Sequence, residues 1–514
     1  MPEPAPFTRL AALKSPAAFR EYAATLGLDL PCDDAVLTGA QSPLAQPLEG
    51  LQINGKCPLN RWAIQPMEGW DGTPAGGITD EVRRRWRRFG ESGAGILCGG
   101  EAMAVRPDGR ANPNQLVIGP ATERDLAELV SLARAAHRER YGVAAADRLI
   151  IGFQLTHSGR FCRPREKTRP EPRVAFRHPL LDRRFGVTSD AQVFTDAELD
   201  RLVEDYVAAA RVARAAGADF VDLKHCHGYL LHELLGAHTR PGRYGGSFEN
   251  RTRFLREVVA AIRADGNPIE LGVRLSAFDF VPFRPDPARS APGKPGPGIP
   301  EDFRGCLPYR YGFGVHPEHP LEPDLAETFR FAELCVELGI QVLNLSAGSP
   351  YYNPHIQRPA MYPPSDGYQP PEDPLVGVAR QVDAVRRVKE HLRQIRSPKS
   401  EVRSPKSEPS GLLVVGSAYS YLQEFLPLVA QAVLRAGWVD VVGLGRAVLS
   451  YPTMLADAVE TGRLDPRRIC RTFSDCTTAP RNGLISGCYP LDPYYAARPE
   501  AQRLKALKRG VPAG

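Results

Sequence analysis

Short apolar runs that end in polar residues recur along this chain, and the most polar end follows residues 220–223. This run has the composition of a buried strand, and Lys224, His225, His227 and Tyr229 follow it within six positions. Val or Leu at these positions would pack better, and parallel α/β folds collect catalytic residues at the carboxyl ends of their strands. The pattern therefore predicts a catalytic site at the end of this strand.

Helical periodicity follows the same strand. After a glycine-containing turn at 242–246, apolar residues recur from Phe254 to Ile262 at the spacing of one helix face. Further strands are predicted at 60–67, 93–102, 149–160, 269–276, 340–346, 411–416 and 439–443. Strands separated by helical segments indicate an α/β fold.

Composition and charge exclude several classes of function. The 514 residues can form one large barrel of about 250–400 residues with extras, or two to three ordinary domains. The net charge of +6 is small and mixed along the chain, which argues against nucleic acid as a partner. The ten cysteines are scattered along the chain, as in proteins of a reducing compartment. The sequence also shows no signal pattern and no run of about 18 apolar residues. We therefore expect a cytoplasmic protein without membrane contact.

Two neighbouring motifs carry a family resemblance. HGYLL at 227–231 is followed by R-x-x-x-YGGS-x-ENR-x-RF at 240–254. The pairing resembles the signature of the Old Yellow Enzyme family of FMN-dependent NAD(P)H:flavin oxidoreductases. The resemblance implies a (β/α)8 TIM barrel with an N-terminal extension, loop insertions and a C-terminal cap, similar to the barrel of 2,4-dienoyl-CoA reductase and trimethylamine dehydrogenase. The alternative is a structural strand-turn-helix in another α/β barrel.

The same resemblance assigns the flavin ring contacts. NRWAIQPM at 60–67 is similar to the first strand of the family and places Pro66, Met67 and Glu68 beside the flavin, where Glu68 replaces the usual Thr or Cys. Ala102 ends the second strand, and Gly99-Gly100 before it would allow close approach of the flavin. Gln154 offers an amide donor and acceptor to the ring edge.

Charged and glycine positions complete the predicted FMN site. Arg274, in a stretch similar to the family's G-[VL]-R-[LI]-S, would stabilise the negative charge of reduced flavin. Barrels often bind phosphate in the loops after strands seven and eight, and the resemblance there implies that Gly416, Ser417, Gly445 and Arg446 hold the FMN phosphate.

The catalytic roles come from alignment on Gly228-Tyr229. Tyr229 falls on the family's proton donor, His227 on a position held by His or Asn, and Lys224 on a position that is normally His. The leading hypothesis is an ene-reductase that uses NAD(P)H and FMN to reduce an activated alkene. Because an ammonium suits a carboxylate or enolate, an acidic or acyl substrate is a further expectation.

Three alternatives remain open. The first keeps the flavin but demethylates or dehydrogenates an amine. The second is a cofactor-free barrel in which Lys224 forms a Schiff base. The third is a flavin-binding or electron-carrying protein without turnover. The expected partner is a small-molecule substrate, and a homo-oligomer is also open.

Segments outside the barrel motifs complete the picture. We expect an extension at 1–45 that packs over the barrel bottom, a barrel at 46–469 and a cysteine-containing segment at 470–514. Within the barrel, 278–324 is a Pro-rich excursion over the mouth. Residues 396–409 hold a heptad duplication, RSPKSEV then RSPKSEP, which we interpret as a flexible insert. Cys470, Cys476 and Cys488 resemble the iron-sulfur segment of larger relatives, but Phe473 stands where another cysteine is expected, so we predict no [4Fe-4S] cluster and no metal.

Several polar residues admit a structural or a functional interpretation. His157 and Arg160 either pin the loop that follows them or contact a ligand. The basic run RRRWRR at 83–88 is interpreted as a solvated helix face. His355 and the aromatic residues around it would suit a substrate wall.

Overall fold

The computed structural model describes residues 7–396 and 411–508. The duplicated insert predicted at 396–409 therefore lies outside the described residues, apart from Arg396, the last residue of helix α12.

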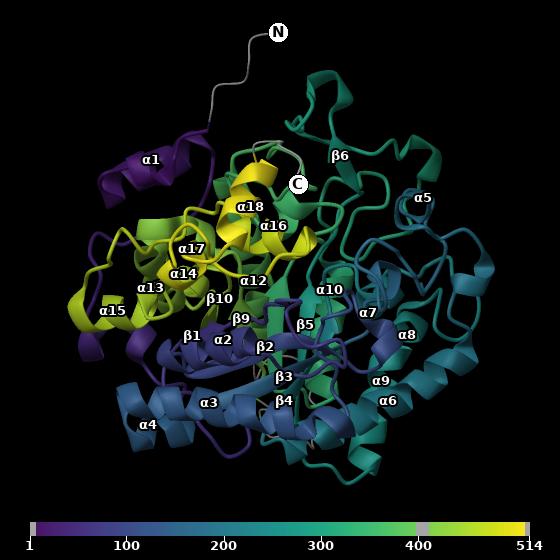
Figure 1. Ribbon diagram of the computed structural model, residues 1–514, viewed down its shortest axis with the longest axis horizontal. Helices are drawn as coiled ribbons and strands as arrows, with labels where there is room; N and C mark the ends of the chain where they lie inside the picture. The colour runs from purple at the N-terminus through teal and green to yellow at the C-terminus, as the bar shows by residue number, and fades with distance from the viewer. Residues whose placement is uncertain (1–6, 397–410, 509–514) are drawn as a thin grey trace.

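Eight parallel strands close into a barrel (Figure 1). They are β1 (Trp62–Ile64), β2 (Ile96–Ala104), β3 (Ile150–Thr156), β4 (Phe220–His225), β5 (Glu270–Ser276), β8 (Val342–Ser346), β9 (Leu413–Gly416) and β10 (Val441–Leu444). Each strand pairs with its neighbours in chain order, and β1 closes the ring by pairing with both β2 and β10. The predicted TIM barrel is confirmed, with strand ends within a few residues of the predicted ones.

Helices form the outer layer because each presents one apolar face to the strands. The longer ones are α2 (Asp80–Glu91), α3 (Glu123–Tyr141), α6 (Asp196–Ala215), α9 (Arg253–Ala264), α10 (Ala326–Glu337), α12 (Pro374–Arg396), α13 (Leu426–Arg435) and α15 (Met454–Thr461). The shorter ones in the body of the chain are α4 (Val143–Arg148), α5 (Asp182–Phe185), α7 (Leu230–Leu235), α8 (Phe248–Arg251), α11 (Pro354–Gln357) and α14 (Ala447–Ser450). In α9 the residues of the predicted stripe, Phe254 to Ile262, are buried as the periodicity required.

The amino end of the barrel is closed by residues that precede β1. Leu48 and Ile53 join a buried cluster with Ile96, Phe220 and Val441, which come from three strands. The helix of the N-terminal extension, α1 (Pro16–Thr25), lies elsewhere. Its Phe19 stacks on Phe425 after β9, with ring centroids 4.6 Å apart. The expectation that the extension covers the barrel bottom was therefore wrong for this helix, because its apolar face packs on a loop at the opposite end.

Two further segments lie at the carboxyl end of the barrel strands (Figure 1). The Pro-rich excursion forms a hairpin of β6 (Phe283–Pro285) and β7 (Gly298–Pro300). The C-terminal segment forms α16 (Asp475–Arg481), α17 (Pro493–Ala496) and α18 (Glu500–Lys508), which lie together above the strands.

Within the described residues, no helix has the length and apolar content to cross a membrane.

Candidate active site

A cavity of about 220 Å³ opens at the carboxyl ends of the barrel strands. Of the predicted site residues, those that line it are Pro66, Met67, Glu68, Gln154, Lys224, His227, Tyr229, Arg274, Ser417, Gly445 and Arg446. The other two, Ala102 and Gly416, lie behind the wall: Ala102 pairs with Gln154 in the sheet, and the Gly416 carbonyl accepts a hydrogen bond from Gln65. The fold thus brings together residues that are far apart in the sequence.

A sharp turn after β4 points the side chains of His227 and Tyr229 into this cavity. His227 and Gly228 have positive φ angles of 67° and 76°, a conformation that glycine adopts readily and histidine only with strain. A Cβ atom at Gly228 would lie 2.8 Å from the ring of Tyr352, so the turn also needs a glycine for space. The turn presents His227 and Tyr229 beside Lys224, the next-to-last residue of the strand.

Glu68 accepts hydrogen bonds from three directions. Lys224 Nζ forms a short ion pair with its Oε1, while Tyr229 Oη (2.8 Å) and Trp70 Nε1 (2.9 Å) donate to its Oε2. The Lys224 side chain is only 4% exposed and that of Glu68 13%. The two residues that depart from the family pattern are thus partners, and each neutralises the charge that the other brings.

Tyr229 is held with its proton in place. Burial, followed by the charge of Glu68 and the proximity of Tyr351, raises the pKa of Tyr229 well above its ordinary value. Its phenol oxygen lies 2.9 Å from that of Tyr351, and Lys224 Nζ lies 3.7 Å from the centre of its ring. The phenol is therefore fully protonated near neutral pH, and a cation lies against the ring where a phenolate would form.

His227 is uncharged. Burial, followed by Arg274 and Lys224, lowers the pKa of His227 well below its ordinary value. Its Nε2 lies 3.3 Å from the side-chain amide of Gln357 and 3.5 Å from Ser346 Oγ, and a neutral imidazole carries one N–H donor. His227 can therefore donate one neutral hydrogen bond.

A buried carboxylate orients the polar floor of the cavity. Gln154 Nε2 donates to Asp222 Oδ2 at 2.7 Å, and Asp222 is 2% exposed in the centre of the barrel. Burial raises the pKa of Asp222 to about 6, against the opposing effect of Gln154, Arg274 and Lys224. Because the Gln154 nitrogen is committed to Asp222, its carbonyl oxygen is available to a donor in the cavity.

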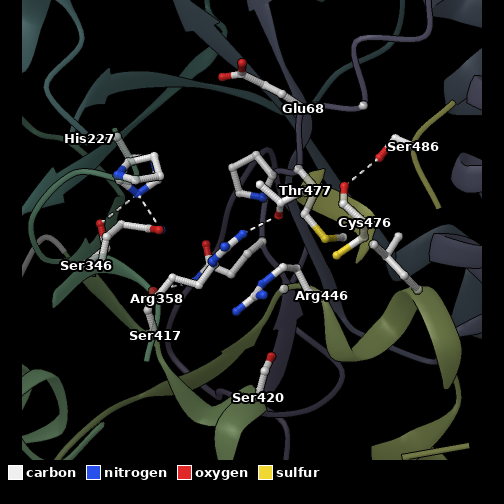
Figure 2. A pocket seen from close by; sticks show the side chains of 18 of the residues that line it. Glu68, His227, Ser346, Arg358, Ser417, Ser420, Arg446, Cys476, Thr477 and Ser486 are labelled. Atoms are coloured by element: carbon white, nitrogen blue, oxygen red, sulfur yellow. Dashed lines mark hydrogen bonds between the residues drawn. The ribbon is translucent and has the colours of Figure 1, made fainter. Parts of the chain in front are cut away.

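The opposite end of the cavity is strongly cationic (Figure 2). Arg358, from the loop after β8, and Arg446, from the loop after β10, extend into the same part of the cavity near Thr477. Arg358 Nη1 donates to Thr477 Oγ1, but Arg358 Nε and Arg446 Nη1 are buried without a hydrogen-bond partner. Burial, followed by repulsion from Arg446 and Arg481, lowers the pKa of Arg358 well below its ordinary value.

These donors fit an anionic group with a flat polar ring. Two uncompensated guanidinium groups, the hydroxyls of Ser417 and Ser420 and the open space beside Gly445 suit a phosphate. Arg274 Nε is also buried without a partner, and Gln154 offers a carbonyl acceptor to the same cavity. The donor set matches what FMN requires, a phosphate at one end and a polar ring edge that becomes negative on reduction at the other.

Some sequence interpretations change with the structure. Gly99 and Gly100 form a bulge whose absent Cβ atoms make room for Gln154 and for the ring of Trp86, and neither glycine lines the cavity. The basic helix face is not wholly solvated either. Arg85 is 4% exposed, lines the cavity and pairs with Asp71 and Glu101. The number of arginines in this run did not indicate that one of them is buried. Arg85 is buried because it lies on the same face of α2 as Trp86 and Phe89.

Other polar residues have structural roles. Arg160 pairs with Asp182 and Glu233 at 2.6 Å each, and His157 accepts a hydrogen bond from the Gly159 backbone, so these motif residues pin the loop after β3. His355 does not form a substrate wall, because its Nδ1 is bonded to Tyr368 Oη at 2.6 Å outside the cavity.

The sequence did not single out several lining residues. Gln357 and Arg358 come from the loop after β8, and Thr477 and Arg481 from the C-terminal segment. Tyr351, one of the aromatic residues near His355 that the sequence suggested as a substrate wall, does line the cavity. The Pro-rich excursion contributes none of the lining residues. The loop at 347–373 directly follows strand β8 and contains a single arginine, Arg358. An arginine in a loop at the carboxyl end of a barrel strand was the available signal that this residue belongs to the site.

The cysteine-containing segment forms part of the cavity wall. Cys476 faces the cavity beside Thr477 and Ser486 (Figure 2). Among the described residues, no group of three or more His, Cys, Asp or Glu side chains could hold a metal ion. Phe473, which stands where the resemblance to larger relatives would place a further cysteine, stacks on Tyr362.

Comparison with known proteins agrees with this geometry. Residues 49–286 match the NADH:flavin oxidoreductase / NADH oxidase family. NADPH dehydrogenases of Clostridium acetobutylicum and Geobacillus thermodenitrificans are 32% and 34% identical over 237 and 239 residues. Each match covers 45% of this chain and 64% or 62% of the relative, so the chain matches less than two thirds of their length.

Solved structures share the fold at lower identity. 2-Naphthoyl-CoA reductase superposes with a TM-score of 0.60 at 17% identity, covering 88% of this chain and 57% of its own. An Old Yellow Enzyme homologue from Zymomonas mobilis gives 0.51 at 18% identity, covering 82% and 94%. Residues 49–286 and the barrel that they begin are thus similar to the NADH:flavin oxidoreductase / NADH oxidase family.

Proposed function

We propose that this chain is an FMN-dependent NAD(P)H oxidoreductase that reduces the carbon-carbon double bond of an α,β-unsaturated carbonyl compound. The observation that carries the proposal is the position of Tyr229. Its protonated phenol faces the same cavity as the neutral His227, with the unpaired guanidinium groups of Arg274 and Arg446 on the cofactor side. The NADPH dehydrogenases among the relatives support a nicotinamide as the reductant.

Each side chain has a defined part in the reaction. Bound FMN would supply the hydride, received from NAD(P)H and passed to the β-carbon of the alkene. The ring N–H of His227 and one N–H of Lys224 donate to the carbonyl oxygen, where negative charge develops. In comparable sites each such donor lowers the activation barrier by about 3 kcal/mol. Tyr229 then transfers its phenolic proton to the α-carbon and becomes a phenolate beside the Lys224 ammonium.

The Schiff-base alternative is less well supported by the geometry. A lysine attacks a carbonyl through an uncharged amine, whereas Lys224 is engaged in a short ion pair with Glu68. The arrangement favours an ammonium that donates hydrogen bonds.

The test is product analysis with isotopic labels. FMN-reconstituted protein with NADPH and 2-methylcyclohex-2-enone should give 2-methylcyclohexanone, with one deuterium at the α-carbon when the reaction runs in D₂O. In Tyr229→Phe, NADPH should still reduce the flavin while alkene reduction falls by about 10²- to 10⁴-fold. The matched control is Tyr351→Phe, which removes the neighbouring phenol and should retain most of the activity. Unchanged turnover in Tyr229→Phe would exclude Tyr229 as the proton donor.

A further inference from the structure

The cations that line the cavity divide into two groups. The lining contains Arg85, Lys224, Arg274, Arg358, Arg446 and Arg481. Three of them have carboxylate partners: Arg85 pairs with Asp71 and Glu101, Lys224 with Glu68, and Arg481 with Asp366. Within residues 7–396 and 411–508, Arg274, Arg358 and Arg446 form no ion pair.

The three unpaired cations belong to the cofactor side. Arg358 and Arg446 extend into the part of the cavity that would hold the FMN phosphate, and Arg274 lies on the strand next to Lys224, where a reduced flavin ring would carry its negative charge. A phosphate dianion and a reduced ring together carry about three negative charges, which these three guanidinium groups can balance. No uncommitted cation then remains on the substrate side of the described cavity.

Lys224 is the cation nearest the proton donor, and its charge is already balanced. Glu68 takes one of its three N–H groups, and the ring of Tyr229 covers one side of the ammonium. A remaining N–H can still donate to an uncharged carbonyl oxygen. A substrate carboxylate would instead share one ammonium with Glu68, and two buried carboxylates side by side repel each other.

We infer that the ion pair of Glu68 with Lys224 makes this site select uncharged carbonyl compounds and reject carboxylates. The inference rests on the proposed function and names its substrate class. It reverses the expectation from sequence that a lysine at position 224 favours an acidic substrate, because that expectation considered Lys224 without Glu68. Glu68 thereby acts as a specificity-determining residue as well as the acceptor that holds Tyr229 and Trp70.

The test compares two ligands of nearly equal shape that differ in charge. Dissociation constants of cinnamamide and trans-cinnamate are measured by titration calorimetry on the oxidised FMN-bound protein at pH 7.5. Wild-type protein should bind cinnamamide at least about tenfold more tightly, since a buried, unpaired charge is strongly unfavourable. Comparable or tighter binding of cinnamate would overturn the inference.

Variants then assign the preference to the ion pair. Glu68→Gln leaves Lys224 with no carboxylate partner and should reverse the order, so that cinnamate binds more tightly than cinnamamide. The double variant Glu68→Gln with Lys224→Met removes the free ammonium and should lose that gain. An unchanged ratio in Glu68→Gln would also overturn the inference.

The results distinguish a failure of the proposed function from a failure of the charge selectivity. If the protein binds no FMN or fails to reduce an enone, the proposed function itself is wrong. If it reduces the enone but does not discriminate between cinnamamide and cinnamate, only the charge selectivity is wrong.

Discussion

Arg358 gives a sharp prediction because it should affect the apoprotein and the FMN complex in opposite directions. Its side chain is half-buried near Arg446, with Nη1 hydrogen-bonded to Thr477, Nε buried and no ion-pair partner among the described residues. In the apoprotein this arrangement is unfavourable, as the lowered pKa of Arg358 indicates. With a phosphate present, the same group becomes a charge-assisted donor.

The expected magnitudes follow from these two states. Arg358→Met removes a hydrogen bond to a charged group, about 1.5–3 kcal/mol, which raises the Kd for FMN roughly 10- to 150-fold. It also removes a half-buried cation that Arg446 and Arg481 repel, which should stabilise the apoprotein by about 1 kcal/mol. The melting temperature of the apoprotein should therefore rise while FMN affinity falls.

The assay combines FMN fluorescence titration of the apoprotein with thermal melts of the apo and FMN-bound forms. Arg481→Met serves as the matched control, because Arg481 lines the same cavity but is paired with Asp366. That control should change the Kd for FMN by less than about threefold. If Arg358→Met binds FMN as tightly as wild type, the phosphate does not lie between Arg358 and Arg446.

Three further predictions concern charge and protonation. Lys224→Met leaves Glu68 buried without its cation and should lower the free energy of unfolding by about 3–5 kcal/mol in urea melts; adding Glu68→Gln should recover part of the loss, and equal stability of the single and double variants would contradict the pairing. His227→Ala should lower kcat/KM for an enone by about 10²-fold with flavin reduction by NADPH retained, since one donor to the carbonyl is lost; an effect confined to the NADPH half-reaction would contradict that role. The pKa of Asp222 is raised to about 6 by burial, so the folded state retains a proton that the unfolded chain loses near pH 4. Stability from Asp222 is therefore lost as pH rises from about 4 to about 6, by roughly 1–3 kcal/mol, and Asp222→Asn should remove this part of the pH dependence measured by urea melts.

The sequence was sufficient for the barrel and for most of the cavity because those features depend on short local patterns. Strand ends that carry polar residues and the paired motifs at 227–231 and 240–254 predicted site residues such as Tyr229, Gln154 and Arg274, and the structure brings these three together around one cavity. What could not be predicted depends on contacts between distant segments. The ion pair of Glu68 with Lys224 joins residues 156 positions apart, and the approach of Arg358 to Thr477 joins residues 119 positions apart.

Burial explains the remaining differences. Arg85 sits in a run of arginines that looks solvated, yet its place on the apolar face of α2 directs it inward to Asp71 and Glu101. Gly99 and Gly100 make room for protein side chains where close approach of a ligand was expected. In both cases the local sequence is compatible with either environment, and only the packing of the neighbouring element decides.

An anaerobic absorption titration directly tests whether the protein uses bound FMN to pass electrons from NADPH to an enone. Protein reconstituted with FMN is titrated with NADPH and then with 2-methylcyclohex-2-enone, and the flavin bands are followed throughout. We expect the bands to bleach with NADPH and to return with one equivalent of the enone. A protein that binds no FMN, or whose reduced flavin is not reoxidised by the enone, would contradict this expectation.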